Sequence, residues 1–170
     1  MSNPDQNLAS TFAFWVLRLW LGVRAVFTGL EKYAGTVTEQ QPLLDEFGEP
    51  DINGAMVEVS NKVYGLEHYH GIPVPLADKF AAEPLLPGWA LGIYDTVLGP
   101  LLIAMGITLL LGIAPRISLL VHGLVYVSLT VGLILIKQDG GIAWLGIHVA
   151  LVALALRLVQ HDRFSILKKW

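Results

Sequence analysis

The sequence lacks cysteine and is short of charge. None of its 170 residues is Cys, and only 15% are Asp, Glu, Lys or Arg, whereas about a quarter is usual in soluble domains. Without thiols the chain has no disulfide framework, thiolate metal site, iron–sulfur cluster or cysteine nucleophile. The formal net charge of -3 offers no basic surface, so no nucleic-acid partner is expected.

Apolar residues are in excess, at 54% of the chain, and the mean hydropathy is +0.59. A helix needs about 20 mostly apolar residues to cross a bilayer core. Four segments meet this length: residues 11–30, 89–114, 117–136 and 142–159. The sequence therefore predicts an all-α fold, a single polytopic membrane domain whose four spans form an antiparallel bundle in a lipid bilayer. The first ten residues have neither a basic region nor a small-residue cleavage site, so no cleaved signal peptide is expected.

Basic residues near the span ends predict the orientation. They gather after the last span, at Arg157, Arg163, Lys168 and Lys169. Arg116 lies in the turn between the second and third spans, on the same side, whereas the loop 31–88 is mainly acidic. Because Lys and Arg are enriched in cytoplasmic segments, we expect both termini in the cytoplasm of a bacterial-type inner membrane and the long loop outside it.

The loop 31–88 is expected to be ordered. A helix capped by Asn53 and running to about Leu66 would place its apolar side chains on one face. A second short helix is predicted for residues 74–82, where Pro73 introduces it. Both would be amphipathic and would cover the outer end of the bundle.

Histidines are the candidates for a metal or a haem. His68 and His70 could face one side of an extended segment, but a metal site needs further ligands, so a loop without metal is the favoured interpretation. His122 and His148 differ in depth by about 13 Å at the rise of a helix, which is too far to ligate one iron. His122 with His161 fits a haem better, although His161 lies at the interface. We therefore expect no metal and no intrinsic haem b.

Arg24, Asp95 and His148 lie at the same depth, roughly 9 Å inside the outer surface of the hydrocarbon core. Arg and Asp each cost about 2.5–3.5 kcal/mol at a helix centre, so they should face the interior and pair. Thr28 and Glu31 follow Arg24 on the same helix face. These five residues predict a buried polar cluster, which either fixes the helix register or serves as a quinone or proton site.

A stripe of glycines favours an internal position for Asp95. Gly92, Gly99 and Gly106 recur every seven residues in the second span, and Asp95 lies on the same stripe. Small residues mark the faces at which membrane helices approach closely. We therefore expect this stripe to face another helix.

The spans resemble the DoxX-like family of small four-helix membrane proteins, which includes the DoxD proteins. The similar stretches are Leu17-Arg18-Leu19-Trp20-Leu21-Gly22, Phe27-Thr28-Gly29-Leu30-Glu31-Lys32, the series Asp95, Gly99, Gly106, Gly112, Arg116, and the tail Arg163-Phe164-Ser165. The family commonly has Glu where this chain has Asp95, and its minimal members have a shorter first loop. The resemblance implies a four-helix inner-membrane protein associated with oxidoreductases. DoxD proteins form a membrane subunit of thiosulfate:quinone oxidoreductase, and we do not transfer the thiosulfate reaction to this chain.

Three functional classes follow. The favoured one is a membrane subunit of a respiratory-type oxidoreductase complex, accessory rather than catalytic, which anchors a redox partner at the extracytoplasmic face and contributes to a quinone site. The second is a small transporter or ion-conducting protein that uses the buried Arg24, Asp95 and His148. The third is a haem-b cytochrome subunit. A chain without Cys and with one haem pair at most needs a partner's cofactor to move electrons.

Overall fold

The computed structural model describes residues 4–44, 47–50 and 54–166. Its four long helices are α1 (Pro4–Leu30), α3 (Gly88–Leu111), α4 (Pro115–Leu135) and α5 (Asp139–Leu158). All four are long and apolar enough to cross a membrane, which confirms the predicted spans and is the pattern of a multi-pass membrane protein. Large apolar side chains such as Phe12, Val16 and Leu124 are exposed on the outside of the bundle, as lipid contact requires.

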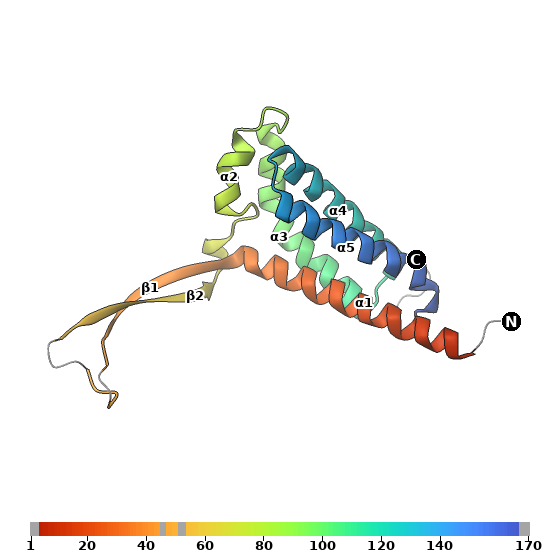
Figure 1. Cartoon of the computed structure of the whole chain (residues 1–170), viewed down its shortest axis with the longest axis horizontal. Coiled ribbons are helices and arrows are strands. Elements are labelled where there is room, and N and C mark those ends of the chain that lie inside the picture. Colours follow the sequence, from red (N-terminus) through yellow and green to blue (C-terminus); the bar gives the residue numbers. More distant parts are fainter. Residues whose placement is uncertain (1–3, 45–46, 51–53, 167–170) are drawn as a thin grey trace.

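The bundle has two ends, which we name by the segments they carry. The termini end holds the start of α1, the turn 112–114 and the short 3-10 helix η3 (Val159–His161) that follows α5. The loop end holds the end of α1 with its 3-10 extension η1 (Glu31–Tyr33), the start of α3 and the turn 136–138. Figure 1 shows both chain ends on the same side of the bundle, opposite the loop.

Glycines bring α1 and α3 into close contact. A Cβ added at Gly106 would lie 2.7 Å from the carbonyl oxygen of Gly22, and one added at Gly29 would lie 2.9 Å from that of Gly99. The predicted close-packing stripe is therefore confirmed at Gly106, whereas at Gly99 an added Cβ would meet the Tyr69 ring of the loop at 2.6 Å. At Gly92 an added Cβ would meet no described atom within 4 Å. The close contact therefore does not extend to the first turns of α3.

The turn between α3 and α4 is determined by the residues at the ends of these two helices. Gly112 ends α3 with a positive φ of 70°, and Pro115 begins α4 at a position where its missing N–H costs nothing. Fully buried Leu109 and Leu119 flank this turn and belong to the bundle core, together with Phe14 and Leu21 of α1.

The loop contains a β-hairpin where a helix was predicted. Strands β1 (Ala34–Pro42) and β2 (Met56–Tyr64) pair antiparallel, from Ala34 with Tyr64 to Pro42 with Met56. The predicted helix ending near Leu66 is therefore wrong over this range, and its cap Asn53 lies outside the described residues. The valines of β2 fit a strand period as well as a helical one, and pairing with the Thr- and Val-containing β1 decides between them. The fold is consequently helical with one small two-stranded sheet.

The rest of the loop returns to the bundle. The hairpin projects away from the helices (Figure 1), so it does not form the expected cover. After the 3-10 helix η2 (Leu66–His68), helix α2 (Val74–Ala81) confirms the second predicted loop helix and lies beside α3. Among the described residues, α2 and the segment just before it therefore cover the loop end.

Candidate functional site

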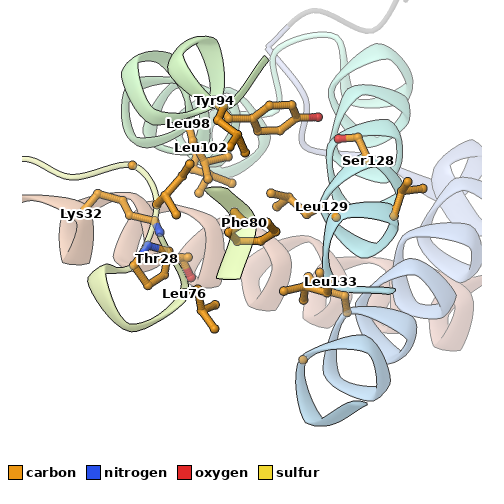
Figure 2. A pocket seen from close by; sticks show the side chains of 18 of the residues that line it. Thr28, Lys32, Leu76, Phe80, Tyr94, Leu98, Leu102, Ser128, Leu129 and Leu133 are labelled. Atoms are coloured by element: carbon orange, nitrogen blue, oxygen red, sulfur yellow. The ribbon is translucent and has the colours of Figure 1, made fainter. Parts of the chain in front are cut away.

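A cavity of about 540 Å³ lies at the loop end, where α2 meets the bundle. All five helices contribute to its wall, and almost all of the wall is apolar. Its principal lining residues are Leu76, Phe80, Leu91, Leu98, Leu102, Leu129, Leu133, Trp144 and Leu145. Figure 2 shows Phe80 and Leu76 of α2 pointing into the cavity. A space of this size is typical of a small-molecule site.

One wall of the cavity carries an amine and a hydroxyl. Thr28 and Lys32 are one helical turn apart at the end of α1, and both line the cavity (Figure 2). Lys32 is a half-buried residue, and its ammonium has no hydrogen bond or ion pair with any residue that the structure describes, although Asp95 acts on it electrostatically. Tyr94 and Ser128 place two more hydroxyls on the wall formed by α3 and α4. The cavity is therefore apolar with a few polar groups that could orient a ligand.

The segment before α2 fixes that helix over the cavity. The backbone N–H of Ile72 donates a hydrogen bond to Asp95 Oδ1 at 2.8 Å, and Tyr69 donates its hydroxyl to Thr96 O at 2.8 Å. Burial raises the pKa of Tyr69, so its hydroxyl stays protonated and able to donate. Gly71 packs directly on the Asp95 backbone, where no Cβ would fit. These contacts attach the loop to α3 from Asp95 to Gly99, and the Tyr69 ring packs over Gly99.

The predicted pairing of Arg24 with Asp95 is wrong. No ion pair joins them in the described part of the chain, and Asp95 is exposed, with its carboxylate on the loop backbone. The depth estimate counted α3 as membrane-embedded from Trp89. Because the loop packs on α3 as far as Gly99, Asp95 belongs to the loop contact rather than to the bundle interior.

The other members of the predicted cluster also separate. Thr28 lines the cavity, whereas Glu31 is about half exposed and bonds Lys62 Nζ at 2.6 Å and the Tyr64 hydroxyl at 3.0 Å. The Glu31 carboxylate raises the pKa of Lys62, and this pair ties the base of the hairpin to the end of α1. Only Arg24 and His148 remain in the interior, half-buried and buried respectively.

Two histidines and a tyrosine form a buried row in the interior. His122 and Tyr126 of α4 and His148 of α5 are each no more than 5% exposed. The Tyr126 ring lies edge-on to both imidazoles, with centroids 6.0 Å from His122 and 5.6 Å from His148. His148 in turn contacts Trp144 at 5.6 Å, which lines the cavity. We refer to His122, Tyr126 and His148 as the histidine row.

The remaining histidine candidates lie apart. His70 bonds the carbonyl of His68, and His68 lies 3.8 Å from Glu67. Among the described residues no three His, Cys, Asp or Glu side chains are grouped as a metal site. His161 lies in η3 beside Gln160, and no ring contact with His122 is recorded in the described chain.

The sequence interpretation missed a buried ion pair at the termini end. Arg18 of α1 is 5% exposed and bonds Asp162 Oδ1 at 3.3 Å. Its guanidinium also donates to the carbonyl oxygens of Leu109 at 2.7 Å, Leu110 at 3.0 Å and Phe164 at 3.2 Å. It therefore caps the end of α3 and holds the C-terminal tail. An arginine inside an apolar span was itself the signal, because such a charge must find partners.

Comparison of the chain with protein-family models, with curated proteins and with solved structures found no match.

Proposed function

We propose that the chain is a membrane subunit of a respiratory-type oxidoreductase complex and that its loop-end cavity binds the ring of a quinone. The observation that carries this proposal is the Lys32 ammonium beside Thr28 on the wall of an otherwise apolar cavity. The ammonium of this half-buried lysine has no acceptor in the described chain, which favours a ligand that brings an oxygen, because an unpaired donor inside a protein is costly. A quinone brings carbonyl oxygens on a flat apolar ring.

The apolar wall fits the rest of such a molecule. Leucines of α3, α4 and α5 line the cavity, and these three helices are long and apolar enough to cross a membrane. A lipid-soluble ring with an isoprenoid tail could enter from the membrane without crossing water. The resemblance of the spans to DoxX-like proteins supports the same class of complex.

The hairpin is the proposed anchor for the redox partner at the extracytoplasmic face. Val37 and Val57 are exposed on it, and an isolated two-stranded hairpin has marginal stability in water. A partner that covered this arm would therefore stabilise it. In this proposal the partner supplies the electron carrier, the loop end faces outward from a bacterial-type inner membrane, and both termini are cytoplasmic.

Quinone binding is tested by tryptophan fluorescence. Titrating the purified protein in detergent with a short-tailed ubiquinone should quench Trp144, which lines the cavity, and Trp144→Phe should remove the saturable part of the quenching. Lys32→Met and Thr28→Val should raise the Kd by about tenfold if each removes one hydrogen bond to a charged or polar group.

Lys137→Met is the matched control, because Lys137 is an exposed lysine in the turn between α4 and α5 and does not line the cavity. It should leave the Kd unchanged. An unchanged Kd in Lys32→Met, with quenching intact, would show that the amine does not bind the ring oxygen and would contradict the proposed site.

The proposed orientation is tested by cysteine labelling, because the sequence has no cysteine of its own that would react. Single-cysteine variants Glu49→Cys and Arg163→Cys should react with an impermeant maleimide from opposite sides of the membrane. In intact spheroplasts only Glu49→Cys should be labelled. Labelling of both variants from one side would contradict the four-span topology.

A further inference from the structure

The two imidazoles of the histidine row are held in the same tautomer. His122 Nδ1 lies 2.9 Å from the carbonyl oxygen of Ser118, and His148 Nδ1 lies 2.8 Å from that of Trp144. A carbonyl oxygen can only accept, so each Nδ1 carries the hydrogen. In a neutral ring the other nitrogen, Nε2, is then a free base with an available lone pair.

Neither Nε2 atom is used by the fold. Both are buried, and neither has a hydrogen-bond partner in the described part of the chain. His122 is 0% and His148 is 3% exposed, so water on the surface does not satisfy them either. Buried polar atoms are nearly always paired, and an exception calls for an explanation such as internal water or proton transfer. Two such atoms on neighbouring helices, α4 and α5, call for a shared explanation.

A residue that can exchange protons contacts both imidazoles. The Tyr126 ring contacts both imidazoles edge-on, and its hydroxyl can donate and accept. The charged group that acts on it is Arg24 of α1, which has no ion pair with a described residue. Ionisable side chains inside a membrane bundle commonly mark routes for protons or ions.

Contacts extend the histidine row towards both ends of the bundle, through hydroxyl groups at the termini end and through an aromatic ring at the loop end. Towards the termini end, the Ser118 hydroxyl bonds the Thr108 hydroxyl at 2.8 Å, one turn before His122. Towards the loop end, His148 contacts Trp144, which forms part of the cavity wall. The series therefore runs along the bundle, from the turn between α3 and α4 to the cavity.

We propose that His122, Tyr126 and His148 form a proton-conducting path between the termini end of the bundle and the loop-end cavity. This activity goes beyond quinone binding and does not require a ligand in the cavity. Each imidazole accepts a proton at Nε2 and releases it from the same nitrogen, so the Nδ1 bond to the helix carbonyl is kept. Tyr126 gives its hydroxyl proton to one side as it takes one from the other. Internal water completes the hydrogen bonds, only N–H and O–H bonds form and break, and no electron moves.

The test is proton flux into liposomes that contain the full chain. Vesicles of phosphatidylcholine enclose a pH-sensitive dye, and a potassium gradient with valinomycin provides the driving potential. Wild-type vesicles should acidify faster than protein-free vesicles. Tyr126→Phe, which keeps both ring contacts, and His148→Asn, whose amide can still bond the Trp144 carbonyl, should each lose this added flux.

Matched substitutions outside the bundle provide the controls. Tyr33→Phe removes a hydroxyl from a ring that stacks on Tyr69, and His70→Asn removes a loop imidazole. Both should conduct as the wild type does. Circular dichroism and gel filtration establish that each variant is folded before it is reconstituted.

The outcomes separate this proposal from quinone binding. Lost flux with quinone quenching retained in Tyr126→Phe would support the path. Wild-type flux equal to that of protein-free vesicles, or full flux in both Tyr126→Phe and His148→Asn, would overturn it and leave the quinone site untouched. Loss of flux and quenching together would also overturn it, because damage to the bundle as a whole would then explain both.

Discussion

Arg18→Ala is expected to lower the free energy of unfolding by about 3–5 kcal/mol, the usual result of removing one partner of a buried ion pair. The side chain of Asp162 is only 4% exposed, so its carboxylate would be left without its cation in a dry site. The Leu110 carbonyl oxygen would lose its Arg18 donor at the same time, and the Leu109 carbonyl oxygen would keep only the Gly112 N–H among the described donors. Unfolding in mixed micelles by SDS titration, followed by circular dichroism, measures the change.

A double-mutant cycle tests whether the lost stability comes from the interaction between Arg18 and Asp162. Asp162→Ala should also destabilise strongly, and the double variant Arg18→Ala with Asp162→Ala should lose less than the sum of the two single losses. Arg163→Ala is the control, because Arg163 is exposed beside the pair and should change stability by less than about 0.5 kcal/mol. Strictly additive losses would show that the two side chains do not stabilise each other.

Gly106→Ala is expected to destabilise the bundle by about 1–3 kcal/mol, the usual cost of overpacking. The added Cβ would lie 2.7 Å from the Gly22 carbonyl oxygen and 2.8 Å from the Val26 nitrogen. Both are backbone atoms, so relief requires α1 and α3 to move apart. The change is again measured by SDS unfolding.

Gly92→Ala is the matched control, two heptads earlier on the same helix. An added Cβ there meets no described atom within 4 Å, and alanine is the better helix former by about 1 kcal/mol. Stability should therefore stay the same or rise. A loss in Gly92→Ala as large as that in Gly106→Ala would show that the helix contact is not the cause.

The helices could be predicted from the sequence because their signal is local and strong. Residues 89–114 and 117–136 are apolar over a membrane-spanning length, and Pro115 marks the boundary between them. The hairpin could not be predicted in the same way, because Met56–Tyr64 fits either periodicity and residues 43–55 separate it from its partner strand. Its pairing with Ala34–Pro42 is a tertiary effect.

The charged residues were predicted with less success because depth was counted along each helix separately. That count placed Asp95 level with Arg24, whereas the loop packs along α3 to Gly99 and supplies the Ile72 N–H to Asp95. It also passed over Arg18, whose partner Asp162 lies outside every apolar segment. His148 was identified as interior, and His122 was recognised as lying inside a span. Their unpaired nitrogens depend on side-chain geometry that no spacing rule provides.

The pairing of Arg18 with Asp162 also sets the order in which the protein can be completed during synthesis. The two residues are 144 positions apart, so Arg18 enters the membrane with α1 long before the ribosome reaches Asp162. Until then its guanidinium lacks the carboxylate, and before α3 is in place it also lacks the Leu109 and Leu110 carbonyls. A chain that stops before Asp162 leaves the Arg18 guanidinium without its carboxylate partner. The bundle therefore acquires its buried ion pair only after the segment that carries Asp162 has been made.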